Sequence, residues 1–330
     1  MLAGKANSCI FEDTVKHQTM SLRFPCVMML LLLSFVSKAQ DVKWIPFHWT
    51  GDTISGKYFD KSAIVIPVSI ENIPARFNMQ FDLGAVRTVI YGNSIAPYLE
   101  AYPELKKKID PSKTFLIQGE NNPMFSRMSL KMGGASFDGL DIGYFKNYGG
   151  RLSKEDLLSD AEKHIGTIGP DLFQGKILII DYPKKRIGIC EALPRQYREA
   201  SFQPFKSGDG RPKIPLTING KTQYVMFDTG SSIFTLQTTK KEALDAAGAK
   251  IIDSLTVNSW GKKLTFYGVK AKKPIKFGTK VLEGSTLYYD EQETFQDFYK
   301  FVEILGLTGN AFFLNSTVII DYKNKLFGVL

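Results

Sequence analysis

The sequence FDTGSS occupies residues 227–232, and an altered version, FDLGAV, occupies residues 81–86. In both, an aspartate comes directly after an apolar run and directly before a turn of small residues. The glycine of each turn permits a tight backbone and leaves amide groups free to point at the carboxylate. Two such segments, roughly half the chain apart, predict that the chain contains an internal duplication.

The sequence around both aspartates repeats as well. Residues 66–85 and 214–231 both open with Ile-Pro, alternate through two strand-like runs and end in Phe-Asp-x-Gly. The second copy has Asn219-Gly220 between its runs, which is a strong signal for a hairpin turn. Residues 166–189 likewise parallel residues 306–329, and Ile-Ile-Asp-Tyr occurs in each. The sequence therefore predicts two related, mostly β halves.

The rest of the pattern adds a few helices and a boundary. Periodicity predicts helices at about 96–108, 152–164, 240–249 and 292–302. Residues 191–213 mix proline, glycine and charged residues, as is typical of a junction. We expect an N-terminal lobe over residues 40–195 and a C-terminal lobe over residues 196–330.

The beginning of the chain predicts export. Residues 20–40 contain one cation, Arg23, an apolar run over 27–36 and small residues at Ser37 and Ala39. This is the pattern of a signal peptide, expected to span residues 1–39, with Met20 as an alternative start. Cleavage leaves Cys190 as the one cysteine, so no internal disulfide forms, which favours a secreted or periplasmic bacterial protein. No later segment is apolar enough to span a membrane.

Charge and composition exclude several classes of function. The chain of 330 residues carries 42 Lys and Arg against 33 Asp and Glu, a formal charge of +9. The lysine runs are short and lie beside helix or hairpin signals, so we expect solvated faces and no nucleic-acid partner. Only three histidines are present, and no zinc or phosphate-binding motif occurs. We expect no metal and no cofactor.

The paired aspartates indicate a chemistry. If the halves pair about a pseudo-twofold axis, Asp82 and Asp228 meet near that axis. Two carboxylates in contact share one proton and titrate in two separate steps. One then acts as general base on a water, and the protonated one polarises a substrate carbonyl. Such a pair is able to activate water against a carbonyl group without a metal or a covalent intermediate.

With these motifs the chain resembles the pepsin/retropepsin-like aspartic proteases, specifically bilobal secreted bacterial members. Residues 228–232 match the active-site motif of that family, and residues 166–169 and 306–309 look like its paired hydrophobic-Gly elements. The resemblance implies a mostly β, bilobal pepsin-like acid-protease fold with two related β-barrel-like lobes and a few short helices. It implies that the shared-proton pair hydrolyses peptide bonds, with a peptide or protein as substrate, and one chain suffices to build the site. The implied catalytic residues are Asp82 and Asp228, supported by the turn residues Gly84, Ala85, Thr229, Gly230 and Ser231.

The first copy departs from the family pattern. Leu83 stands where the family usually has a threonine that hydrogen-bonds across the axis, so at most the bond from Thr229 survives. Ala85 replaces a hydroxyl that bonds the carboxylate. Fewer donors predict a weakly acidic pH optimum. The segment 115–130, expected to form the hairpin flap, has no tyrosine, and Trp260-Gly261 marks the corresponding hairpin in the second half.

Alternatives to an active peptidase stay open at this point. The Leu83 change is also compatible with a catalytically impaired peptide-binding protein, and Asp82 with a turn aspartate left over from duplication. A third hypothesis is a structural surface protein whose cleft has no role. Asp181 and Asp321, in the Ile-Ile-Asp-Tyr copies, are expected to be turn residues.

Overall fold

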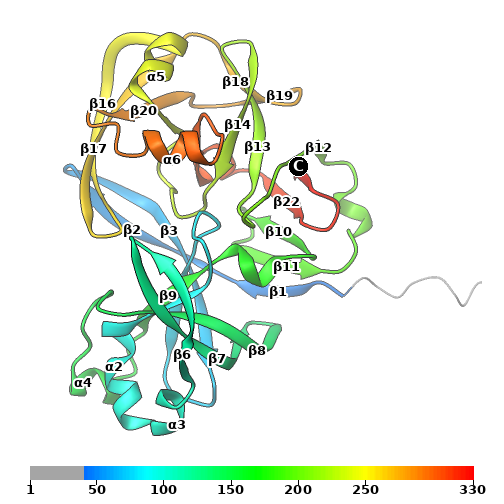
Figure 1. Cartoon of the computed structure of the whole chain (residues 1–330). Helices are drawn as coiled ribbons and strands as arrows, with labels where there is room; N and C mark the ends of the chain where they lie inside the picture. Colours follow the sequence, from blue (N-terminus) through cyan, green and yellow to red (C-terminus); the bar gives the residue numbers. More distant parts are fainter. Residues whose placement is uncertain (1–40) are drawn as a thin grey trace, which may run out of the picture. The chain divides into compact units, whose positions relative to one another are not determined.

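The computed structural model describes residues 41–330, which are mostly β-structure. The strands form three sheets that curl into half-barrels (Figure 1). The predicted signal peptide, residues 1–39, lies outside the described residues, as do Cys9 and Cys26. Within residues 41–330, no helix combines the length and the apolar character needed to cross a bilayer.

The first half of the chain forms an eight-stranded sheet with the order β2-β3-β4-β9-β5-β8-β7-β6. Strand β3 also pairs with β7, so the sheet folds back on itself. The strands are β2 (His48–Ile54), β3 (Lys57–Ile70), β4 (Phe77–Phe81), β5 (Val89–Tyr91), β6 (Ile109–Ile117), β7 (Glu120–Met132), β8 (Ala135–Phe145) and β9 (Lys163–Ile168).

The second half forms a nine-stranded sheet with the order β16-β17-β20-β15-β21-β14-β13-β18-β19. The strands are β13 (Lys213–Ile218), β14 (Lys221–Phe227), β15 (Leu236–Thr238), β16 (Ala247–Ser259), β17 (Lys262–Ala271), β18 (Ile275–Phe277), β19 (Lys280–Leu282), β20 (Thr286–Asp290) and β21 (Gly306–Thr308).

The two sheets share one pairing pattern, which is the structural counterpart of the sequence repeat. In the first, β4 lies parallel to β9, β9 antiparallel to β5, and β5 parallel to β8. In the second, β14, β21, β15 and β20 follow the same order with the same directions. The hairpin predicted at Asn219-Gly220 joins β13 to β14, with positive φ at both residues. The repeated hairpins are therefore confirmed.

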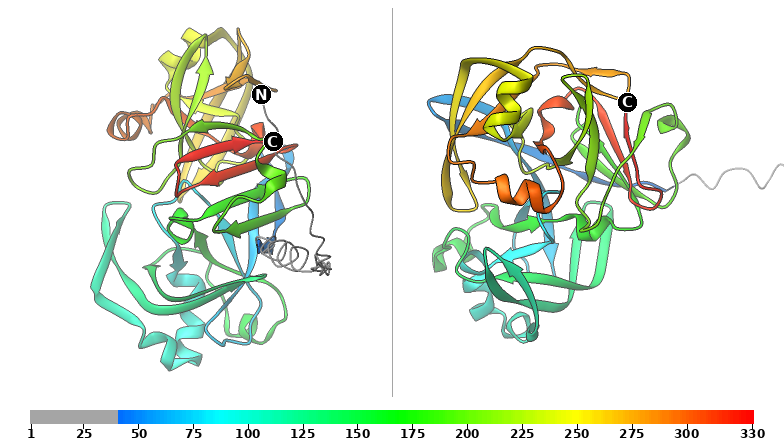
Figure 2. Two further views of the ribbon diagram at one scale, coloured as in Figure 1. Left: turned by 90° about the vertical axis from the view of Figure 1, so that its right-hand side faces the viewer. Right: turned by 45° about the horizontal axis from the view of Figure 1, so that its top comes forward.

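A third, six-stranded sheet combines both halves, in the order β1-β11-β10-β22-β23-β12. Its central strands carry the two Ile-Ile-Asp-Tyr copies, which pair antiparallel with Ile179 opposite Ile319. In Figure 2 (left) the green strands of this sheet lie beside the red ones. The strands are β1 (Lys43–Pro46), β10 (Ile177–Asp181), β11 (Arg186–Cys190), β12 (Ser201–Pro204), β22 (Thr317–Asp321) and β23 (Leu326–Val329). The predicted boundary at 195/196 falls between β11 and β12 and stays a prediction.

The helices are present where the sequence predicts them but are shorter. The predicted helix 96–108 is split by Pro103, because proline removes a backbone donor and disfavours helix before it. The helix predicted over 152–164 was wrong beyond its first turns, since Lys163 and His164 begin β9 and pair with β4. The helices are α2 (Gly92–Ala101), α3 (Pro103–Lys106), α4 (Lys154–Leu158), α5 (Lys240–Ala246) and α6 (Gln296–Phe301), with 3-10 turns η1 (Pro170–Phe173), η2 (Arg195–Tyr197) and η3 (Asn310–Phe312).

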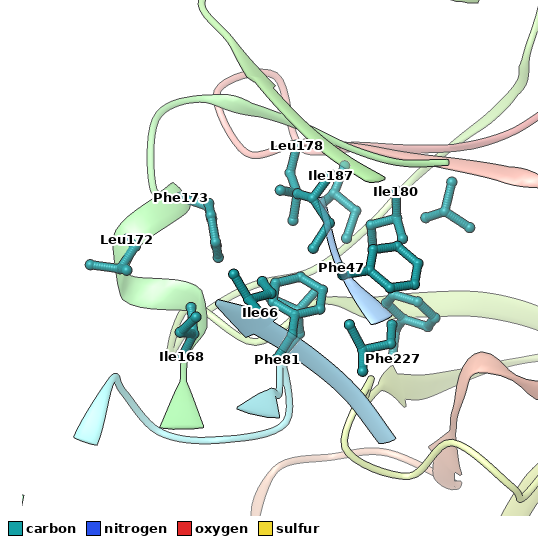
Figure 3. Close-up of a cluster of buried hydrophobic side chains, with 14 of the residues drawn as sticks. Phe47, Ile66, Phe81, Ile168, Leu172, Phe173, Leu178, Ile180, Ile187 and Phe227 are labelled. Carbon is teal, nitrogen blue, oxygen red and sulfur yellow. The ribbon is translucent and has the colours of Figure 1, made fainter. Parts of the chain in front are cut away.

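The main hydrophobic core lies beneath the ends of β4 and β14. Phe81 and Phe227, the last residues of these strands, are fully buried in one cluster with side chains of the six-stranded sheet (Figure 3). The ring of Phe81 packs edge-on against Phe173, and that of Phe227 against Phe313. This packing fixes the position of the residue that follows each strand, Asp82 after β4 and Asp228 after β14.

Long hairpins connect the two halves away from this core. The β2–β3 hairpin, blue in Figure 1, lies beside β16, where Thr256 N donates to Ser55 Oγ at 2.8 Å. Ile54 and Phe59 of this hairpin pack on a buried cluster of the second half that contains Phe234 and Leu255. The first half therefore contributes apolar surface to the second outside the shared sheet.

We predict that Ile179→Ala destabilises the fold by about 2–5 kcal/mol, because this side chain is fully buried where the two halves pair. Urea unfolding followed by circular dichroism measures the change. The matched control is Ile252→Ala, at a residue that is 50% exposed, and it is expected to stay within about 0.5 kcal/mol of the parent protein. Equal effects of the two changes would contradict a shared central sheet.

Candidate active site

Two equivalent turns carry the predicted aspartates. Asp82 follows β4 and Asp228 follows β14, so each aspartate comes directly after a fully buried phenylalanine, Phe81 or Phe227. Asp82 N donates to Ile168 O at 3.0 Å, and Asp228 N donates to Thr308 O at 2.9 Å. Each turn is thus held by the strand that the repeated Gly-x-x-Gly segment forms.

The structure brings Asp82 and Asp228 together. A Cβ added at Gly84 would lie 2.3 Å from Asp228 Cγ, and one added at Gly230 would lie 2.6 Å from Asp82 Cγ. Such distances are impossible for real side chains, so each glycine is required by the carboxyl group of the opposite turn. Since each glycine lies against the carboxyl group of the other turn, the two carboxyl groups are close together.

Backbone amides cradle both carboxyl groups. Asp82 Oδ1 accepts bonds from Gly84 N at 2.9 Å and Ala85 N at 3.0 Å. Asp228 Oδ1 accepts one from Gly230 N at 2.8 Å. Asp82 is buried, at 6% exposure, whereas Asp228 is partly exposed. The Ser231 hydroxyl accepts a bond from Gln237 Nε2 at 2.6 Å.

The surroundings favour one shared proton. Burial, followed by the charge of Asp228, raises the pKa of Asp82 well above its ordinary value. Burial also raises the pKa of Asp228, but a hydrogen bond from Asp82 and bonds from the amides of Gly230 and Ser231 oppose that rise, as does the charge of Arg211. Both shifts favour a pair that holds one proton between its two carboxyl groups, and the opposing contributions at Asp228 favour Asp82 as the carrier of that proton.

Thr229 joins the two turns from one side only. Its Oγ1 accepts a bond from Leu83 N at 2.9 Å and donates to Phe81 O at 3.0 Å. Leu83 is fully buried in the hydrophobic core and has no polar side-chain atom to reciprocate. The sequence-based expectation that only the Thr229 side bonds across the axis agrees with this geometry.

Gly169 and Gly309 lie so close to the backbone of the two turns that no side chain would fit at either position. A Cβ at Gly309 would lie 1.5 Å from Ser231 O, and a Cβ at Gly169 would lie 2.4 Å from the Arg87 carbonyl carbon. Glycine therefore ends each repeated segment because backbone of the facing turn fills the space where a side chain would be.

Sequence reasoning missed the polar residues that follow these glycines. Asn310 is fully buried, and its Nδ2 donates at 2.7 Å to both Thr229 O and Ser232 Oγ. In the first half, Asp171 Oδ1 accepts bonds from Thr88 N at 2.8 Å and Thr88 Oγ1 at 2.7 Å. Their place in the sequence could have indicated them, since Asn310 lies one residue and Asp171 two residues after the end of the repeated Gly-x-x-Gly segment.

Other candidates from the sequence lie elsewhere. Asp181 accepts from Lys184 N and Arg186 Nε, and Asp321 accepts from Lys323 N and Asn324 N, as expected of turn residues. Two surface hollows have volumes of about 370 and 120 Å³. Arg76 and Asp160 line the first, and Lys43 and Glu191 line the second. Neither hollow is lined by Asp82 or Asp228.

The two expected hairpins meet at their tips. The segment 115–130 lies in the β6–β7 hairpin, which turns at Gln118-Gly119, and the β16–β17 hairpin turns at Trp260-Gly261. Gln118 Nε2 donates to Trp260 O at 2.9 Å.

We predict that Thr229→Val destabilises the protein by roughly 2–4 kcal/mol, because it leaves Leu83 N–H and Phe81 C=O without the hydroxyl that serves both. Thr229→Ser keeps the hydroxyl and is expected to lose less than about 1 kcal/mol. Guanidinium chloride unfolding of the two variants decides between them. Equal losses would mean that the bonds across the axis contribute nothing.

We also predict that Asp82→Asn stabilises the protein increasingly as pH rises. Because the pKa of Asp82 is raised by folding, its contribution to stability is complete below the unfolded-state pKa of about 3.9 and is lost as pH rises through the folded-state value. Melting temperatures measured from pH 3 to pH 8 should diverge in favour of the variant.

The control for this measurement is Asp138→Asn, which removes an exposed carboxylate. It is expected to track the parent protein at every pH. A constant difference between Asp82→Asn and the parent protein would show that the Asp82 carboxyl titrates normally.

No protein-family model matches this sequence, and a search of curated proteins found no match either.

Proposed function

We propose that this chain is a bilobal pepsin-like aspartic endopeptidase, exported by its N-terminal segment, that hydrolyses peptide bonds between Asp82 and Asp228. The observation that carries the proposal is the contact of two carboxyl groups across Gly84 and Gly230, each presented by a copy of the same turn. The shared pairing pattern of the two sheets supports the bilobal reading.

The arrangement assigns different roles to the two carboxyls. Asp228, ionised, takes a proton from water as the water oxygen attacks the carbonyl carbon of the substrate. Asp82, protonated, donates a hydrogen bond and then its proton to the carbonyl oxygen, which gives a neutral tetrahedral diol. The proton on Asp228 next moves to the amide nitrogen, the C–N bond breaks, and a diol proton returns to Asp82. Protons and electrons balance, and no other reactant is needed.

Backbone geometry supports this division of labour. The amides of Gly84 and Ala85 hold Asp82 in one orientation through a single oxygen, so its other oxygen is left to carry the proton. Thr229 links the backbone of the two turns, and Asn310 holds the second turn through Thr229 O. Preorganised groups of this kind lower the barrier because they do not have to reorient during the reaction.

A second candidate is a peptide-binding protein without turnover. Two observations favour it: the side chain of Leu83 provides no hydrogen bond across the axis, and the tips of the β6–β7 and β16–β17 hairpins are in contact. This alternative retains the peptide site and predicts binding without hydrolysis.

The test is incubation of the purified protein with a diverse peptide library from pH 2 to pH 8, followed by mass spectrometry. Cleavage is expected, with Asp82→Asn and Asp228→Asn each lowering the rate by about 100- to 10,000-fold. Asp138→Asn, at an exposed position, is the matched control and should cleave normally. Hydrolysis by a verified Asp228→Asn protein at the parent rate would refute the proposal, and peptide binding without hydrolysis would favour the second candidate.

The same experiment gives a pH profile. Because the pKa of both carboxyls is raised, we expect a bell-shaped profile with a weakly acidic optimum. A maximum near pH 2 would contradict the electrostatics derived for this site.

A further inference from the structure

A charged loop, residues 207–212, adjoins the second aspartate turn. It begins and ends at the Lys206–Lys213 bridge, where each backbone N–H donates to the carbonyl of the other residue at 2.8–2.9 Å. Near its end, Pro212 O accepts a bond from Phe227 N at 2.8 Å. The loop is therefore fastened beside the residue that directly precedes Asp228.

The register of β13 and β14 places Arg211, in this loop, opposite Asp228. The two strands are antiparallel and pair Lys213 with Met226 at the end nearest the aspartate. The bond to Pro212 O continues this ladder by one residue, and the position after it pairs Arg211 with Asp228. Since hydrogen-bonded and non-hydrogen-bonded positions alternate, this last position is of the second kind, at which facing side chains are closest.

The guanidinium of Arg211 is held in place and largely withdrawn from solvent. Its Nε donates to Asp209 Oδ2 at 2.9 Å, the backbone N–H of Arg211 donates to Oδ1 at 3.1 Å, and the guanidinium lies 5.1 Å from the ring centroid of Phe298. The side chain of Arg211 is 12% exposed and that of Asp209 is 34% exposed. Water therefore screens the carboxylate of this ion pair more than it screens the cation.

The matching position in the first half carries a methyl group. In the sequence repeat, Ala63 and Arg211 both lie three residues before the Ile-Pro pair that opens each copy. The pairing of β3 with β4 agrees, because its register, continued by two residues, puts Ala63 opposite Asp82. The two carboxyl groups of the pair thus have different side chains across from them, an uncharged one for Asp82 and a cation for Asp228.

The ionisable groups near Asp228 come from several elements: Asp82 in the first turn, Arg211 and Asp209 in the loop, Lys213 in β13, and Tyr299 in α6. Lys213 Nζ donates to Val302 O at 3.0 Å. Burial and neighbouring carboxylates raise the pKa of Tyr299, so its hydroxyl stays neutral in acid. Burial raises the pKa of Asp228, the hydrogen bonds from Asp82 and the turn amides lower it, and the charge of Arg211 lowers it further.

We propose that Arg211 is a positioning residue for the shared proton, whose guanidinium keeps Asp228 as the ionised carboxyl and leaves the proton on Asp82. Two copies of one turn present similar backbone amides to both carboxyls, and a cation beside one copy makes the sharing of the proton unequal. The inference rests on the proposed function for its consequence in catalysis, since it assigns the residue that selects the base.

The first test titrates Asp228 directly and needs no substrate. In Asp82→Asn protein labelled with ¹³C at the aspartate carboxyl carbon, NMR follows the resonance that disappears when Asp228→Asn is added. Adding Arg211→Gln instead should raise the titration midpoint of this resonance by about 1 pH unit, because an opposite charge is lost. Arg211→Met, which retains an apolar contact with Phe298, should raise it similarly, and Arg211→Lys should keep it near the starting value.

Two controls separate charge from loop structure. Asp209→Asn breaks the ion pair but retains the arginine, so the midpoint should stay unchanged or fall. Arg76→Gln removes an exposed arginine that pairs with Glu162 at 3.3 Å, and it should change nothing.

The second test is the pH profile of hydrolysis with both aspartates intact. Its acidic limb reports ionisation of the base, so Arg211→Gln should move that limb upward by about 1 pH unit. Below the limb the rate should fall about tenfold, and at the optimum it should change little. A residue that only stabilises the loop would lower the rate by the same factor at every pH.

The outcomes for function and for Arg211 are separable. The inference is overturned if Arg211→Gln and Arg211→Met leave the midpoint of Asp228 unchanged or lower it, or if Asp209→Asn raises it as much as they do. Absence of hydrolysis at every pH refutes the endopeptidase, and the titration still decides whether Arg211 sets the ionised carboxyl.

Discussion

Two carboxyl groups held in contact inside a protein are a costly arrangement, and the structure around Asp82 and Asp228 is organised to maintain it. Ionising both would place like charges side by side with little water to screen them. The pair is stable because it keeps one proton and because backbone amides serve the remaining oxygen atoms. Glycine at 84 and 230 is needed for the same contact, since any side chain there would overlap the opposite carboxyl.

The shared six-stranded sheet provides the symmetry that this contact requires. Strands β10 and β22 pair about Ile179 and Ile319, and the buried phenylalanines before each aspartate pack on the core of that sheet. The two turns therefore approach each other from equivalent directions. The equivalence ends at position 83, because Leu83 packs into the core while Thr229 bonds across the axis. That asymmetry fits the assignment of a protonated Asp82 and an ionised Asp228, which remains part of the proposal.

Contacts outside the sheet add a second level of connection between the halves. The β2–β3 hairpin reaches the second half through Ser55, and the β16–β17 hairpin reaches the first half through Trp260. Both hairpins also pack on buried hydrophobic clusters of the opposite half.

The sequence by itself determined the repeated elements. Apolar alternation, Asn219-Gly220 and the two Phe-Asp-x-Gly turns are local signals, and they were sufficient to predict the hairpins and the residues of the carboxyl pair. Helix ends were less certain, since pairing of β9 with β4 overrode the helical pattern at Lys163 and His164. Only the tertiary structure decided that the Ile-Ile-Asp-Tyr copies pair with each other, that Asn310 and Asp171 brace the turns, and that Trp260 rests on Tyr148. These contacts join residues that are far apart in the chain, and the geometry that joins them exists only after both halves have folded.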